Sequence, residues 1–193
     1  MSKIALCALF IGTAAFVTSC DKSNEDEMTP AKASLYARLG GTTMVSDPRN
    51  AGQMIEKGRL SYRSVVDTTI ALIVKDIVAN NSGNFSAHFA PLVSEVSAGN
   101  TTNVAVLSKN LTDFFSANTG GASTNTYSGD NMQDAHNPAE NPRMAVKANT
   151  ANYDKFIGYV GSAAVKNNVT DQTIINDVVA VLESLRTQIV QAP

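Results

Sequence analysis

Apolar residues recur at spacings of three and four along most of the chain, which is the period of an amphipathic helix. β-Branched residues are frequent in these stripes, but the spacing and the length of the segments favour helix over strand. The stripes are Leu35 and Leu39; Val66, Ile70, Ile73 and Ile77; Val104, Leu107, Leu111, Phe114 and Phe115; Phe156, Val160, Ala163 and Ala164; and Ile174, Val178, Leu182, Leu185 and Ile189. No repeat and no alternation of strands with helices is visible. The pattern predicts an all-α fold of about five to six helices around one core.

Turn and capping residues set the boundaries of these elements. Thr29-Pro30 predicts the start of the first helix, and Gly40-Gly41 predicts its end. Asp47-Pro48-Arg49-Asn50 predicts a turn. Residues 116–131 are rich in Gly, Ser, Thr and Asn and read mostly as loop, whereas Met132 to His136 predicts a single helical turn that ends before Pro138. The polar residues that follow, up to Thr150, predict irregular structure.

The N-terminus has the pattern of an export signal. Lys3 precedes an apolar run from Ile4 to Val17, which is shorter than the roughly 20 apolar residues of a membrane-spanning helix. Val17-Thr18-Ser19-Cys20 resembles the lipobox of bacterial lipoproteins, in which the cysteine is lipidated after cleavage. The alternative is an ordinary cleavable signal followed by an incidental cysteine.

The sequence therefore predicts three parts: a signal peptide (1–19), a lipidated Cys20 with a flexible tether (20–33) and a folded domain (34–193). This organisation predicts a protein of the cell envelope, exported and anchored by lipid on the periplasmic or outer-surface side. The sequence leaves open which membrane and leaflet receive it.

Composition excludes several classes of function. The 193 residues carry a net charge of −2 and no Trp, so neither a basic footprint nor an aromatic platform for nucleic acid is present. Two cysteines cannot form a disulfide framework. The chain has no Gly-rich phosphate loop, no Cys-x-x-Cys-His and no His-Glu-x-x-His. It has only two histidines, His88 and His136.

The segment from Tyr127 to His136, Tyr-Ser-Gly-Asp-Asn-Met-Gln-Asp-Ala-His, resembles the proximal signature of truncated haemoglobins, and most closely that of their group I branch. Four further segments occur in that family's order, and the resemblance spans most of residues 34–190. They are Leu35 to Gly41, Val65 to Asp67, Phe114-Phe115 with Gly120-Gly121, and Leu185 to Val190. The resemblance implies a truncated globin fold that binds haem b without a covalent bond and binds oxygen, carbon monoxide or nitric oxide at the iron.

The resemblance also assigns roles to single residues. His136 would be the proximal ligand of the haem iron, with Tyr127 and Met132 on the same side of the haem. Phe89 would pack on the haem, and Leu107, Leu111 and Phe115 would line the distal helix. The alternative for Leu111 and Phe115 is an ordinary place in a helical core. A haem is a large apolar disc that needs an apolar slot and one axial nitrogen, and Met132 lies one helical turn before His136 on the same face.

The chain departs from the family in the residues that hold bound oxygen. Thr69-Ile70 stands where the family has Phe-Tyr, and Leu111 stands at the usual distal glutamine position. Because Ile70, Leu107 and Leu111 cannot donate a hydrogen bond, we expect an apolar distal pocket with weaker oxygen retention. His88 has two interpretations: a solvent-facing loop histidine, or a second axial ligand or hydrogen-bond donor on the distal side.

Three further functions remain open at this stage. A redox activity, such as nitric-oxide dioxygenation or a peroxidase-like side reaction, would require an unidentified reductase because the chain shows no flavin domain. Capture and transfer of haem at the cell envelope would need only an apolar pocket of low specificity. A globin-shaped interaction module without haem is the third alternative. We expect gas binding rather than enzymatic turnover and assign no catalytic residue.

Overall fold

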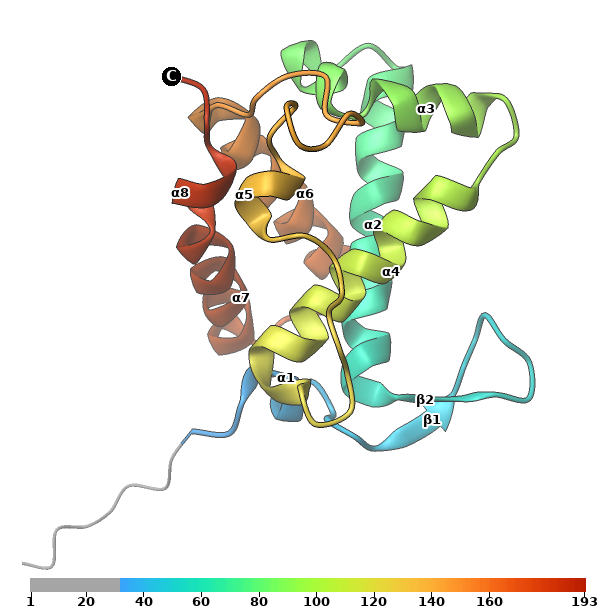
Figure 1. Cartoon of the computed structure of the whole chain (residues 1–193). Helices are drawn as coiled ribbons and strands as arrows, with labels where there is room; N and C mark the ends of the chain where they lie inside the picture. The colour runs from blue at the N-terminus through green and yellow to red at the C-terminus, as the bar shows by residue number, and fades with distance from the viewer. Residues whose placement is uncertain (1–31) are drawn as a thin grey trace, which may run out of the picture. The chain divides into compact units, whose positions relative to one another are not determined.

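The structure is a computed structural model that describes residues 32–193, a single compact unit (Figure 1). The predicted signal peptide and Cys20 lie outside the described residues, as does most of the tether. Within residues 32–193 the fold is all-α apart from one small hairpin, as the sequence predicts. None of the described helices is both long enough and apolar enough to cross a membrane.

The elements follow one another in an order dominated by helices (Figure 1). They are α1 (Leu35–Arg38), β1 (Met44–Ser46), β2 (Met54–Glu56), α2 (Lys57–Val78), the 3-10 helix η1 (Gly83–His88), α3 (Ala90–Ser97), α4 (Thr102–Ser116), the π-turn η2 (Ala117–Gly121), α5 (Met132–Ala135), α6 (Thr150–Lys166), α7 (Gln172–Ser184) and α8 (Arg186–Ile189).

The first helix begins later than the Thr29-Pro30 pattern predicts. Residues 32–34 are not helical, and the hydroxyl of Ser34 accepts a hydrogen bond from the amide of Ala37 at 3.2 Å, so Ser34 caps a helix that starts at Leu35. Thr29 and Pro30 themselves lie outside the described residues. The predicted stop at Gly40-Gly41 is confirmed, because both glycines adopt positive φ (114° and 53°), which favours glycine.

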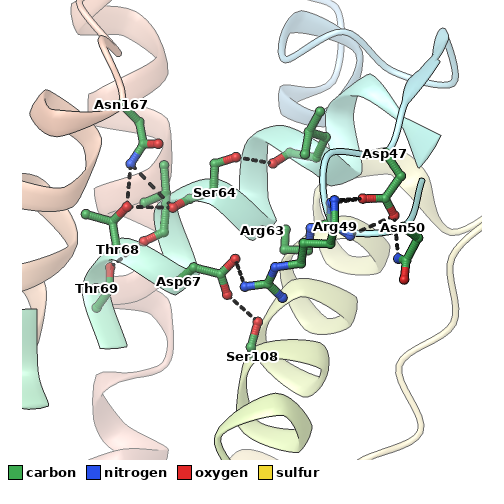
Figure 2. A network of polar contacts seen from close by, with 12 residues as sticks. Asp47, Arg49, Asn50, Arg63, Ser64, Asp67, Thr68, Thr69, Ser108 and Asn167 are labelled. Atoms are coloured by element: carbon green, nitrogen blue, oxygen red, sulfur yellow. Dashed lines mark hydrogen bonds and ion pairs between the residues drawn. The ribbon is translucent and has the colours of Figure 1, made fainter. Parts of the chain in front are cut away.

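The segment after Gly41 forms a hairpin that the helical periodicity did not predict. β1 and β2 pair antiparallel, with Val45 opposite Ile55, and the predicted turn at Asp47–Asn50 lies between them. Figure 2 shows that Asp47 accepts hydrogen bonds from Arg63 of α2 and from the side chain of Asn50. Arg49 reaches Asp67 of α2 in the same network. These contacts fasten the hairpin to the first half of α2.

The centre of the fold is the packing of α4 across α2, visible in Figure 1 as two crossing helices. Three small polar residues of α4, Ser108, Thr112 and Ser116, are almost completely buried at intervals of one turn. Their size lets the two helices approach closely. Tyr62 of α2 stacks on Phe115 of α4 with ring centroids 5.7 Å apart, and both rings belong to the main core.

The last predicted helix is divided in two. Asp171 caps α7 by accepting from the amides of Thr173 and Ile174, as the sequence predicts. The helix ends at Ser184, and α8 begins after Leu185 with a new direction (Figure 1). Val190 then forms a bridge with Ala148. The C-terminus is thereby tied to the irregular segment that precedes α6.

Candidate functional site

One cavity of about 330 Å³ brings together every residue that the sequence assigns to the haem site. Its volume lies within the range of natural ligand pockets. The predicted residues on its wall are Ile70, His88, Phe89, Leu107, Leu111, Phe115, Tyr127, Met132 and His136. These residues come from five separate segments between positions 70 and 136 of the chain. The cavity is therefore a product of the tertiary fold.

Two groups of elements contribute to the wall of this cavity. Ile70 of α2 and Leu107 and Leu111 of α4 form one wall. Met132 of α5 and its C-cap His136 belong to the other, where α5 contacts α8. Most of the wall is apolar carbon, which suits a flat apolar ligand.

His136 is held by the single turn that the sequence predicts at this place. Asn131 caps α5 by accepting from the amide of Asp134 at 3.0 Å, and His136 is the C-cap residue. The Nδ1 atom of His136 lies 2.9 Å from the carbonyl oxygen of Met132. A carbonyl oxygen only accepts, so Nδ1 carries the proton of this hydrogen bond. Nε2 is then the nitrogen with the free lone pair, which is how proteins prepare a histidine for a metal.

The surroundings of His136 favour the neutral form of its ring. Burial lowers the pKa of His136 below its ordinary value, and the charge of the nearby His88 acts in the same direction. The hydrogen bond to the Met132 carbonyl opposes these two effects. A neutral imidazole is the form that binds iron.

The side chain of Tyr127 lines the cavity, and its hydroxyl group donates its hydrogen bond within the protein and not to a ligand. Its hydroxyl donates to the carbonyl oxygen of Asp130 at 2.8 Å, and its ring meets Phe114 edge-on at 5.2 Å. Gly129 lies directly against the tyrosine ring, where a Cβ would come within 2.5 Å of the hydroxyl oxygen. The sequence spacing Tyr-x-Gly thus has a steric reason.

The wall formed by α2 and α4 is mostly apolar. Ile70, Leu107 and Leu111 have no polar atoms in their side chains. Thr69 lines the cavity too, but its hydroxyl donates to the carbonyl oxygen of Val65 at 2.8 Å. Asn110 of α4 adds one side-chain amide to this wall.

Leu111 and Phe115 belong to the cavity wall and to the core at the same time. Phe115 is buried in the main core, and Leu111 packs against that core. Both also line a second apolar cavity of about 350 Å³ between α2, α6 and α7. The two alternatives that the sequence left open for these residues are therefore compatible.

His88 is not a solvent-facing loop histidine. It ends η1, its side chain is only 9% exposed, and its ring lies 5.9 Å from that of Phe85. Nδ1 is buried and has no hydrogen-bond partner. The neighbouring Phe89 is half-buried and packs on Phe85 at 5.2 Å. Both His88 and Phe89 line the cavity.

Several wall residues were not found by the sequence reasoning. Residues 137–149, which we call the strap, contribute Asn141, Met144 and Ala148 to the cavity. The amide of Asn141 donates to the carbonyl oxygen of Ala135 at 2.8 Å, which holds the strap against α5. Asn110 of α4 and Asn152 of α6 also reach the wall. The strap has no periodic pattern, so only its position after His136 could have suggested this role.

The donor set fits a haem better than a bare metal ion. The described residues contain no group of three or more His, Cys, Asp or Glu side chains that could hold a metal ion. The cavity instead offers a neutral imidazole with a fixed tautomer, a second buried imidazole with an unpaired nitrogen, and an apolar slot. An axial imidazole and an apolar slot are the features that non-covalent haem binding requires, and the second imidazole is additional.

Comparisons with models of protein families and with curated proteins gave no match for this chain.

Proposed function

We propose that this chain is a haem-binding globin of the truncated type, which binds haem b non-covalently and a diatomic gas reversibly at the iron. The observation that carries the proposal is the position of His136. It lines a cavity that also gathers the other eight predicted residues, and its Nδ1 hydrogen bond leaves Nε2 free to bind iron. The resemblance of Tyr127–His136 to the proximal signature of truncated haemoglobins supports the same proposal.

In this proposal one part of the cavity wall ligates the iron and the other part excludes water. His136 holds the iron, and Tyr127 and Met132 pack on its side of the haem. Phe89, Ile70, Leu107, Leu111 and Phe115 exclude water from the opposite side. The bound haem would supply an iron that binds oxygen, carbon monoxide or nitric oxide. Because Ile70, Leu107 and Leu111 have no donor and the hydroxyl of Thr69 already donates to a backbone carbonyl, we propose that bound oxygen is held weakly.

The proposed location follows from the N-terminal motif. Lipidation at Cys20 would anchor the domain to a membrane of the cell envelope after export. The partners proposed are haem, a diatomic gas and the membrane, and not a nucleic acid. A redox function would in addition need an electron donor.

Haem capture and transfer is the second candidate, and a specific observation favours it. The strap across the cavity is fastened to α3 by one partly exposed ion pair, Arg143 with Glu95. Exposed ion pairs contribute little free energy, so the strap separates from α3 at low cost, while Asn141 and Ala148 remain bound to Ala135 and Val190. Rapid transfer of haem to apo-myoglobin would favour this function over gas storage.

A haemin titration of the full-length chain in detergent tests the proposal. We expect a sharp Soret band that saturates at one haem per chain. The band should shift when carbon monoxide is added to the reduced protein. His136→Ala should weaken haem binding by more than about 100-fold. Mutating a residue that only hydrogen-bonds to a metal ligand already lowers metal affinity about 10- to 100-fold. Gln133→Ala is the matched control, because Gln133 is exposed on the same helical turn.

Two results would contradict the proposal. Unchanged haem affinity in His136→Ala would remove the proximal role of His136. The lack of any specific Soret band in the wild-type chain would leave a globin-shaped interaction module without haem as the better description.

A further inference from the structure

His88 is buried, and the proposed function assigns it no role. Its side chain is 9% exposed, and its Nδ1 has no hydrogen-bond partner in the described part of the chain. Burying a polar nitrogen without a partner is unfavourable, and native proteins do so rarely. A bond to a ligand would offset the free-energy cost of burying this nitrogen.

His88 and His136 line the same cavity from different segments. His88 ends η1, whose Phe85 packs on Ile73 of α2 and on Tyr159 of α6. His136 is the C-cap of α5, so the two imidazoles reach the cavity from separate elements. The two imidazoles are close enough for the charge of His88 to lower the pKa of His136. No other histidine exists in the chain.

The described neighbours of His88 leave its buried nitrogen without a hydrogen bond. Phe85 and Phe89 are the aromatic rings beside it, and neither accepts a strong hydrogen bond. Because His88 lines the cavity and Nδ1 has no partner among the described residues, a ligand in the cavity is the group with which this imidazole can form a bond.

We propose that His88 is a second axial ligand, which binds the iron on the face opposite His136 when no gas is present. The inference rests on the proposed haem site. A gas would then bind by ligand exchange: the bond between iron and the His88 nitrogen breaks as the bond between iron and gas forms, with no change in electron count. Without gas, His88 therefore occupies the gas-binding position of the iron. The apparent gas affinity depends on the fraction of molecules in which His88 is not bound to the iron.

The test compares the haem-loaded full-length chain with three variants. They are His88→Ala, His88→Phe and, as a control outside the cavity, Gln133→Ala, which changes an exposed residue of α5. Wild type and Gln133→Ala should show low-spin, six-coordinate spectra in both ferric and ferrous states. Both His88 variants should become high-spin. Added free imidazole should restore the low-spin spectrum of His88→Ala but not of His88→Phe, which fills the space.

Carbon monoxide affinity provides an independent measurement. If His88 occupies the iron in about nine molecules of ten, removing it raises the apparent affinity about tenfold. His88→Phe keeps an aromatic ring beside Phe85 and so preserves the packing of the wild type. It can therefore be measured even if His88→Ala folds poorly.

The possible failures are distinguishable. A high-spin spectrum of the wild type, or a low-spin spectrum that persists in both His88 variants, overturns the role of His88 and leaves the haem site intact. The lack of a saturable Soret band in the wild type overturns the haem site and the role of His88 together.

Discussion

The guanidinium group of Arg143 donates two hydrogen bonds of 2.9 Å to the two carboxylate oxygens of Glu95. This pair joins the strap to α3, and Glu95 also accepts from the side chain of Asn103 in α4 at 2.9 Å. These bonds hold the pKa of Glu95 below its ordinary value, with the hydrogen bonds from Arg143 as the largest cause. One carboxylate thus connects three segments beside the cavity.

Breaking this pair should speed the loss of haem. An exposed ion pair is worth about 0.2–1 kcal/mol, so Arg143→Ala should raise the rate of haem transfer to apo-myoglobin by roughly 1.5- to 5-fold. Glu95→Gln should act in the same direction, and the double variant should add little beyond either single change. Arg49→Ala is the control, because Arg49 pairs with Asp67 and does not line the cavity. Equal transfer rates in all variants would show that the strap is not the route of release.

Introducing a donor on the α4 wall should strengthen oxygen binding. Leu111→Gln adds an amide beside Ile70 and Leu107, on a wall whose other side-chain amide is that of Asn110. One hydrogen bond contributes about 0.5–1.5 kcal/mol, so oxygen should dissociate roughly 2- to 10-fold more slowly. The measurement is replacement of oxygen by carbon monoxide in a stopped-flow instrument. Leu111→Met adds no donor and should leave the rate close to that of the wild type; a comparable slowing in this variant would attribute the effect to volume.

Gly129→Ala should destabilise the protein through Tyr127. The new Cβ would lie 2.5 Å from the tyrosine hydroxyl oxygen and 2.6 Å from Cζ, while the ring is packed against Phe114 on another side. Overpacking of this kind costs about 1–3 kcal/mol, which urea unfolding followed by circular dichroism would measure.

Gly158→Ala is the matched control for that prediction. Gly158 lies in α6, and its Cβ would meet nothing within 4 Å. Replacing an exposed helical glycine by alanine should stabilise the protein by about 0.5–1 kcal/mol. Destabilisation by both substitutions would mean that the contact with Tyr127 is not the cause.

Alkali should unfold the protein as its tyrosines ionise. Burial, the largest cause in each case, raises the pKa of four tyrosines to about 12, compared with an ordinary value of about 10. They are Tyr36, Tyr62, Tyr153 and Tyr159. The folded state therefore binds the phenolic protons more tightly than the unfolded state does. This contribution to stability is complete below about pH 10 and is lost as the pH rises toward about 12.

The measurement is a joint titration of tyrosinate absorbance and far-ultraviolet circular dichroism. We expect both signals to change together, because the buried phenols ionise when the chain unfolds. Ionisation near pH 10 without loss of helix would contradict the prediction. The chain unfolded in urea is the reference and should titrate near the ordinary value.

The elements that the sequence predicted well are those with local causes. The stop at Gly40-Gly41, the turn at Met132–His136 and the cap at Asp171 each depend on residues within one or two turns. Where the prediction was wrong, distant contacts decided the outcome. The hairpin of β1 and β2 is fastened by Arg63 of α2 to Asp47, a contact that periodicity does not express.

The sequence by itself determined an all-α domain and named the residues of a candidate haem site, because helical periodicity and the Tyr127–His136 motif are local patterns. Only the tertiary structure decided that these residues line one cavity, that Leu111 and Phe115 serve wall and core together, and that His88 is buried beside the cavity with an unpaired nitrogen. The physical reason is that burial and hydrogen-bond partners depend on side chains brought together from separate helices, and no single stretch of the chain contains that information.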